Sequence, residues 1–209
     1  TGRGRARAVG TVERCLKEEP FRLVVSAGFA GGTRSGFKVG DLVIASEVVD
    51  AASGVRRQPD RRAFGLNSIA SVGPIVTVEA PLAEPAAKAR MGDQYGAVAV
   101  DLETAAIAEL AQRHPIPWVA VRVILDPMEV PLSIRSRRDG VVCLLCPSRW
   151  GVFSQFAGDI RLAARSLAEG LHRVIAAQTI EISKAGWPDG SDTVVLARDT
   201  TFPDALAGA

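Results

Sequence analysis

A nearly continuous apolar run near the middle of the chain limits most strongly how this sequence can fold. It covers Pro117–Leu125, is rich in β-branched residues and is bounded by prolines. Such a run is typical of a strand that is covered on both faces within a parallel sheet. Asp126 follows the run directly, which places an acid just past the carboxyl end of the strand. In open α/β sheets, ligands bind in the crevice outside those strand ends.

A second carboxylate, Glu103, stands at the start of the helix that precedes this strand. The pattern predicts a helix over Leu102–Arg113 with Asp101 at its N-cap position. Glu103 then shares a helix face with Ile107 and Leu110, and a buried acid needs a hydrogen-bond partner or a substrate. One such acid is explained equally well by a structural hydrogen bond. Two acids that flank one strand–helix unit favour a functional site.

The bulk composition indicates one ordinary globular domain. The chain has 209 residues, of which 47% are hydrophobic and 23% are charged, and its formal net charge is +2. These values exclude extensive disorder and a strongly basic nucleic-acid-binding protein. The sequence has no apolar run of about 20 residues that could span a membrane, and no signal-peptide pattern. The odd number of cysteines, 3, favours a reducing, cytoplasmic location over a disulfide scaffold.

Helix and strand patterns alternate along the first half of the chain. The predicted elements are a helix over Arg5–Glu18, strands over Phe21–Ser26, Leu42–Val49 and Pro74–Glu79, a helix over Pro81–Met91 and a strand over Gly96–Val100. This alternation predicts a mostly parallel sheet with right-handed crossovers.

The last third of the chain begins with a predicted long amphipathic helix, from Phe156 to about Ile180. Its predicted inner stripe consists of Ile160, Ala164, Leu167, Leu171 and Ile175. We expect one α/β domain over residues 1–182. Residues 183–209 are rich in Gly, Asp and Pro and are expected to form a loosely attached tail.

A glycine-rich segment, Ala27–Gly32, follows the first predicted strand. A glycine-rich turn lets backbone N–H groups approach a ligand closely, although a tight turn without a ligand explains the segment equally well. The glycine spacing differs from the dinucleotide fingerprint and no helix pattern follows, which argues against a dinucleotide-binding oxidoreductase. Cys143 and Cys146 form a CxxC motif with no second pair and no nearby histidine, so we predict no zinc site.

Three stretches together resemble the nucleoside phosphorylase/nucleosidase superfamily: Val24–Gly32, Val39–Asp50 and Val98–Asp126. This superfamily includes the purine nucleoside phosphorylases and the methylthioadenosine/S-adenosylhomocysteine nucleosidases. The third stretch is the most specific, because it opens with acid-x-Glu-x-x-Ala and closes with Arg-x-x-x-Asp. The PxxKAR run at Pro85–Arg90 looks closest to the hopanoid-associated phosphorylase branch. With the element order, the resemblance implies a single three-layer αβα domain with a central twisted, mostly parallel (mixed) sheet.

The resemblance also implies roles for individual residues. Asp126 would protonate N7 of a purine as the glycosidic bond breaks, because the purine anion is a poor leaving group until it is protonated. Glu103 would bind the ribose hydroxyls and stabilise the oxocarbenium-like sugar. Arg122, inside a strand, is expected to brace nearby acidic or backbone groups. The expected substrate-binding residues are Gly28, Phe29, Ala30, Gly31, Asp101 and Leu102.

Three features depart from the superfamily pattern. A phosphate-binding serine or threonine, with an arginine three residues earlier, is replaced here by Phe29 and Ser26, which favours water as the nucleophile or a nonstandard phosphate pocket. Leu125 stands where a serine usually precedes the catalytic acid. Superfamily members also begin with strands that would precede Thr1, and a protein without them would have a sheet that is short at one side.

The sequence therefore predicts an enzyme that cleaves the N-glycosidic bond of an adenosine-type nucleoside with a modified 5′ position. Water or phosphate would be the nucleophile. Neither a metal nor an organic cofactor is implied, and inorganic phosphate is a possible co-substrate. The resemblance suggests a homo-oligomer in which a neighbouring subunit closes the sugar pocket. The alternative is a catalytically degenerate nucleoside-binding module of the same fold.

Overall fold

The structure is a computed structural model that describes residues 3–18, 23–60, 70–131, 148, 150–184 and 195–198. The helices are α1 (Arg3–Glu18), α2 (Pro85–Tyr95), α3 (Thr104–Arg113) and α5 (Trp150–Lys184). The strands are β1 (Val24–Gly32), β2 (Leu42–Asp50), β3 (Arg56–Arg57), β4 (Ser71–Thr77), β5 (Ala99–Asp101), β6 (Trp118–Asp126) and β7 (Val195–Arg198). The CxxC motif lies outside the described residues.

The strands form one 7-stranded sheet in the order β3-β2-β4-β5-β1-β6, with β7 paired to the first half of β1. The pairs β1–β6, β1–β7, β2–β4 and β4–β5 are parallel, whereas β1–β5, β2–β3 and β2–β6 are antiparallel. The prediction of a mixed, mostly parallel sheet is therefore confirmed. Because β2 also pairs with β6, the twisted sheet curves until its two sides meet.

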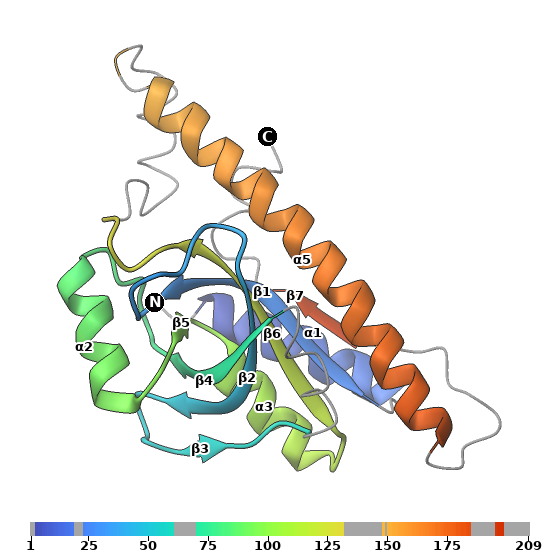
Figure 1. The fold of residues 1–209 in the computed structure, drawn as a ribbon. Helices are drawn as coiled ribbons and strands as arrows, with labels where there is room; N and C mark the ends of the chain where they lie inside the picture. Colours follow the sequence, from blue (N-terminus) through green and yellow to red (C-terminus); the bar gives the residue numbers. More distant parts are fainter. Residues whose placement is uncertain are drawn as a thin grey trace.

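Helices cover the sheet on both faces, as predicted for a three-layer α/β domain (Figure 1). On one face, Val12 of α1 and Ile107 of α3 belong to one buried cluster with Val24 of β1 and Ile124 of β6. On the other face, α5 packs against the same two strands. Both side-chain rows of β1 and β6 are therefore buried, which is why these strands are apolar without alternation.

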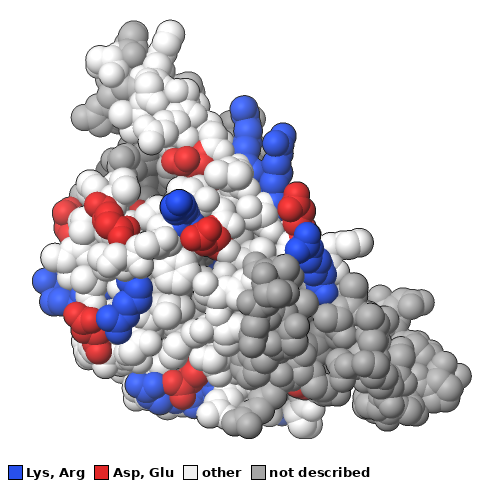
Figure 2. Space-filling model, in the orientation of Figure 1, with Lys and Arg blue, Asp and Glu red and all other residues white. Residues whose placement is uncertain are grey.

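The inner stripe of α5 differs from the prediction at one of the positions that the structure describes, and the side chain of Ile175 lies outside them. Ile160, Leu167 and Leu171 pack against the sheet as predicted, but Ala164 is exposed and Ala163 is buried instead. The first step of the stripe, from Ile160 to Ala163, therefore spans three residues and not four, as the helical period of 3.6 allows. The opposite side of α5 carries charged side chains, and Figure 2 shows Lys and Arg in a row over this helix with an acidic side chain among them.

The glycine-rich segment is a strand and not the predicted turn. β1 continues through Gly32 because both of its edges find partners. β6 runs parallel to it over nearly its whole length, and β5 pairs with Gly31 and Gly32. Strand pairing thus overrides the low strand propensity of glycine.

Helix α2 begins and ends later than predicted. Pro85 occupies its first turn and Gly96 ends it with a φ of 67°, in the left-handed region that favours glycine.

Within the predicted tail, Val195–Arg198 form β7 and pair with β1, while the domain boundary at residue 182 stays a prediction. In the described part of the chain, no helix combines the length and apolarity needed to cross a membrane.

Candidate active site

Asp126 is the last residue of β6, so the predicted acid lies at the carboxyl end of the buried strand. Its register partner on β1 is Gly31, whereas Ala30 pairs with Ile124, so the ladder skips Leu125. Register irregularities of this kind redirect side chains and are frequent next to active sites. The Asp126 side chain is 14% exposed, although the residues before it on the strand are buried.

Gly31 leaves the space beside the Asp126 carboxyl group. A Cβ atom at position 31 would lie 3.5 Å from Oδ2 of Asp126 and 3.2 Å from Cγ1 of Val100. A Cβ atom there would press on Val100 of the neighbouring strand and would be in van der Waals contact with the acid. The absence of a side chain at Gly31 thus leaves room beside Oδ2, and direct substrate contact by Gly31 stays a prediction.

Lys88 of α2 holds the other carboxyl oxygen. Its Nζ lies 2.6 Å from Oδ1 of Asp126, and the lysine side chain is 0% exposed. Nζ also donates hydrogen bonds to the carbonyl oxygens of Pro127 and Val130, each at 2.9 Å. Among the described residues, Lys88 is the one side chain that binds the Asp126 carboxylate.

Burial raises the pKa of Asp126 to about 6, against the opposing effect of the hydrogen bond and charge of Lys88. Loss of hydration disfavours the charged carboxylate, whereas a nearby cation favours it. The balance leaves an acid that holds its proton in weakly acidic solution. A carboxyl group with this pKa can serve as a general acid close to neutral pH.

Glu103 lies between β5 and α3, and it is the N-cap residue of α3. The prediction that Asp101 is the N-cap and that the helix starts at Leu102 is wrong. Asp101 still pairs with Thr77 in the sheet, so the chain stays extended through β5 and turns into the helix later. The Glu103 side chain is 1% exposed, and it shares the buried face of α3 as predicted.

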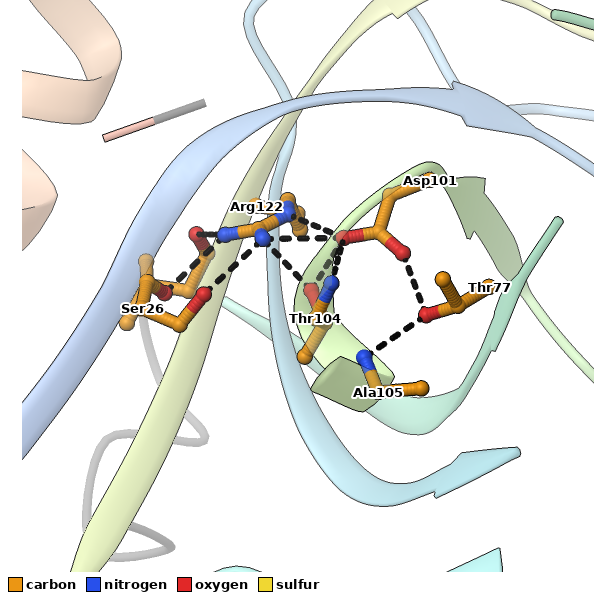
Figure 3. A network of polar contacts seen from close by, with 7 residues as sticks. Ser26, Thr77, Asp101, Thr104, Ala105 and Arg122 are labelled. Carbon is orange, nitrogen blue, oxygen red and sulfur yellow. Dashed lines mark hydrogen bonds and ion pairs between the residues drawn. The ribbon is translucent and has the colours of Figure 1, made fainter. Parts of the chain in front are cut away.

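Arg122 is fully buried at the centre of a polar network, as Figure 3 shows. Its Nε and Nη2 lie 2.9 and 2.8 Å from Oδ2 of Asp101. Its Nη1 donates to the carbonyl oxygens of Ser26 and Val121, and its Nη2 donates to the hydroxyl groups of Ser26 and Thr104. The prediction that Arg122 braces acidic and backbone groups is confirmed.

Asp101 is the acceptor at the centre of the same network. Its Oδ2 accepts hydrogen bonds from the N–H and the hydroxyl of Thr104, and its Oδ1 accepts one from the Thr77 hydroxyl at 2.6 Å. Thr77 in turn accepts the N–H of Ala105 at 3.0 Å. The network therefore binds the start of α3, and with it Glu103, to the sheet. Substrate binding by Asp101 itself stays a prediction.

The remaining predicted substrate-binding residues have different surroundings. Gly28 is buried opposite Arg122 on the neighbouring strand, and Ala30 is 6% exposed within the main core. The Phe29 side chain packs into the apolar cluster under α5. Leu102 packs against the apolar cluster beside α2. Substrate contact by each of these four residues stays a prediction.

Sequence reasoning missed Lys88 as a partner of the acid. A detectable signal was its place on the α2 face that also carries Met91, Gly92 and Tyr95, at spacings of three, four and seven residues. A lysine on a buried helix face needs acceptors, and the structure supplies them at the end of β6 and just after it, although Glu84 stands only four residues earlier in the sequence. Among the described residues, no three His, Cys, Asp or Glu side chains are grouped so that they could hold a metal ion.

Comparisons with known proteins agree with the superfamily resemblance of the three sequence stretches described above. The family described as the phosphorylase superfamily matches residues 1–138. No curated protein sequence matches the chain. Among solved structures, a 5′-methylthioadenosine/S-adenosylhomocysteine nucleosidase from Helicobacter pylori is similar, with 17% identity, a TM-score of 0.63 and coverage of 83% of this chain and 76% of that one.

Two further structures show the same fold. The nucleosidase of the same kind from Neisseria meningitidis, in complex with methylthio-immucillin-A, is 23% identical with a TM-score of 0.60, and the match covers 82% of this chain and 77% of that one. Futalosine hydrolase from Helicobacter pylori is 17% identical with a TM-score of 0.63, over 83% and 76% of the two chains. The family match over more than half of the sequence shows that this chain belongs to the phosphorylase superfamily, whose nucleoside phosphorylases and nucleosidases cleave N-glycosidic bonds.

Proposed function

We propose that this protein hydrolyses the N-glycosidic bond of an adenosine-type nucleoside with a modified 5′ position. Asp126 is the general acid on the base, and Glu103 holds the ribose hydroxyls. The observation that carries the proposal is the Asp126 carboxyl group itself. It lies at the carboxyl end of a buried strand, and burial raises its pKa to about 6.

The chemistry requires an acid that still holds a proton when the base leaves. As the C1′–N9 bond breaks, its electron pair passes to the purine, and a proton delivered to N7 makes the base a better leaving group. A carboxyl group with an ordinary pKa near 3.9 would be almost fully ionised at neutral pH. The raised pKa of Asp126 increases the protonated fraction, and the retained 14% exposure of its side chain leaves it within reach of a ligand.

The strand registers support a sugar site at Glu103 on the same side of β1 as β5. Gly31 of β1 is the register partner of Val100 on one side and of Asp126 on the other. Two strand spacings separate those residues by roughly 10 Å, and Glu103 follows Val100 by three positions. The proposal therefore assigns the base to Asp126 and the sugar to Glu103, on the two sides of β1. Because Glu103 is 1% exposed, ribose reaches it only if neighbouring side chains move aside.

The surroundings of Ser26 and Phe29 support water as the nucleophile. These residues stand where the superfamily pattern has the arginine and the serine or threonine that bind phosphate. Ser26 is buried and already accepts hydrogen bonds from Arg122, and Phe29 packs into an apolar cluster. The similar structures described above are named as nucleosidases and a hydrolase, which supports hydrolysis and an adenosine-type substrate.

Product analysis by chromatography tests the proposal. The protein is incubated with methylthioadenosine, adenosine and inosine, each with and without inorganic phosphate. We expect free adenine from methylthioadenosine at equal rates in both conditions. Base that appears only with phosphate would replace hydrolysis by phosphorolysis. Binding of the nucleosides without any release of base would contradict the enzymatic proposal and favour the degenerate binding module.

Matched variants identify the acid. Asp126→Asn removes the proton but keeps the shape, and we expect turnover to fall about 10²–10⁴-fold while much of the binding remains. Asp93→Asn changes an acid that is 74% exposed on α2, and we expect it to leave turnover unchanged. Normal turnover by the Asp126→Asn variant would show that another group protonates the base.

A further inference from the structure

Lys88 is a buried cation whose contacts all lie on one short segment. Its side chain is 0% exposed, and its three acceptors are Oδ1 of Asp126 and the carbonyl oxygens of Pro127 and Val130. An ammonium group has three protons to donate, so each proton has one acceptor. Burying a lysine is unfavourable unless it is paired in this way.

The helix that carries Lys88 is itself firmly packed. Gly92 lies against the strand end, since a Cβ atom there would be 2.5 Å from the carbonyl oxygen of Thr33. Arg34 donates to the carbonyl oxygen of Gly92 at 2.8 Å. The ammonium group is therefore presented by a fixed helix, so its position relative to β6 is well defined.

We propose that Lys88 is a positioning residue for Asp126: it fixes Oδ1 and the chain segment after β6, and so reserves Oδ2, beside Gly31, for proton transfer to the leaving base. This inference rests on the proposed function, because it assigns the two carboxyl oxygens different tasks in that reaction.

The proton and electron balance follows from this arrangement. The electron pair of the breaking C1′–N9 bond passes to the base, N7 takes the proton from Oδ2, and Asp126 becomes a carboxylate. Water adds its oxygen to C1′ and releases one proton to solvent, and Asp126 later recovers one proton from solvent. Lys88 keeps its protons throughout, and its positive charge stabilises the carboxylate that the transfer creates.

Charged groups around the acid are few in the described part of the chain. β1 contributes Gly31, which carries no charge. The segment after β6 contributes Glu129, whose carboxylate accepts a backbone N–H. On β6 itself, the Arg122 guanidinium group donates to Asp101 and not to Asp126. The other charged side chains of α2 are exposed. Lys88 is thus the cation that acts on Asp126, and its presence lowers the pKa that burial raises.

The test compares the wild-type protein with Lys88→Gln, which removes the charge but keeps an N–H donor for the carbonyl oxygens. The pKa of Asp126 is measured directly from the pH titration of its ¹³Cγ signal. We expect the pKa to rise by about 1–3 units in the variant, the effect expected of one neighbouring opposite charge. The alkaline limb of the kcat/KM profile on methylthioadenosine should move to higher pH by the same amount, and kcat should fall.

Three controls separate positioning from general stability. Asp93→Asn removes the exposed ion pair of the same helix and should move neither the pKa nor the pH profile. In wild-type protein, the ¹⁵Nζ signal of Lys88 should titrate with the midpoint of Asp126, which requires no variant to fold. Lys88→Arg, which keeps the charge, should keep the pKa closer to the wild-type value than Lys88→Gln does.

The outcomes are distinct. The inference would be overturned, even if the enzyme is active, by an Asp126 pKa that is unchanged in Lys88→Gln. It would also be overturned if the ¹⁵Nζ chemical shift of Lys88 did not change as Asp126 titrates. Wild-type protein that releases no base would overturn the proposed function, while the titrations still decide whether Lys88 controls Asp126. A shifted pKa with an unshifted pH profile would show that Lys88 acts on the acid but that another group limits turnover, which also overturns the positioning role.

Discussion

Replacing Arg122 by methionine should destabilise the fold more than most single substitutions. The guanidinium group is 0% exposed and pairs with an Asp101 side chain that is also 0% exposed. Removing one partner of a buried pair leaves the other charge without compensation, which costs about 3–5 kcal/mol. Methionine fills most of the volume, so lost packing should add little. We therefore expect the free energy of unfolding to fall by about 3–5 kcal/mol.

Urea unfolding followed by far-UV circular dichroism measures this change, with the free energy extrapolated to water. Arg34→Met is the matched control, because it also removes an arginine from an ion pair, with side chains that are 43% and 74% exposed. Exposed pairs contribute about 0–1 kcal/mol, so the control should remain close to the wild-type stability.

A double substitution tests the reasoning more strictly. If the cost comes from the uncompensated carboxylate, Asp101→Asn combined with Arg122→Met should be less destabilising than the sum of the two single changes. Two results would refute the argument: strictly additive effects, or a loss below about 1 kcal/mol for Arg122→Met. Either would mean that the hydroxyl and N–H donors around Asp101 compensate its charge without the arginine.

Four further predictions concern the acid and the sugar site. If protonated Asp126 is required, kcat/KM should be constant below a pH of about 6 and fall about tenfold per pH unit above it, because burial raises this pKa to about 6; the Asp126→Asn variant should lose this dependence. That pKa exceeds the value of about 3.9 in the unfolded chain, so protonation of Asp126 adds to the free energy of unfolding. This contribution is complete below pH ~4 and is lost as the pH rises through about 6. Urea unfolding at several pH values would detect it. Gly31→Val should lower kcat by up to about 100-fold, since a Cβ atom already comes within 3.5 Å of Oδ2, and unchanged kinetics would show that the acid tolerates displacement. Glu103→Gln should raise KM and lower kcat together, and a change in neither would remove Glu103 from the sugar site.

The central strand and its acid were predictable because one physical cause controls both. A strand buried on both faces must be apolar throughout, so the run before Asp126 showed where β6 ends. The glycine-rich β1 was misassigned for the opposite reason. Glycine favours turns locally, and only the partners supplied by β5 and β6, which lie far away in sequence, hold Gly31 and Gly32 in a strand.

Contacts between distant segments were beyond the reach of the sequence pattern. Lys88 donates to a carbonyl oxygen 39 residues away, and nothing in the helical pattern identifies that acceptor. The pairing of β2 with β6 likewise follows from the accumulated twist of the sheet. The sequence indicated instead that Arg122 needed partners, because an arginine within an apolar strand is costly unless its donors are satisfied.

The surroundings of Asp126 and Asp101, each paired with a buried cation, explain why one aspartate is suited to chemistry and the other to support. Both oxygens of Asp101 accept hydrogen bonds, from two threonines and from Arg122, and its side chain is 0% exposed. Asp126 has one oxygen bound by Lys88, and its side chain is 14% exposed. Both oxygens of Asp101 thus hold the start of α3 and the Arg122 guanidinium group in place. With a single cation at Oδ1 and a glycine beside Oδ2, Asp126 can both hold a proton and release it, so the position of Lys88 determines which oxygen does so.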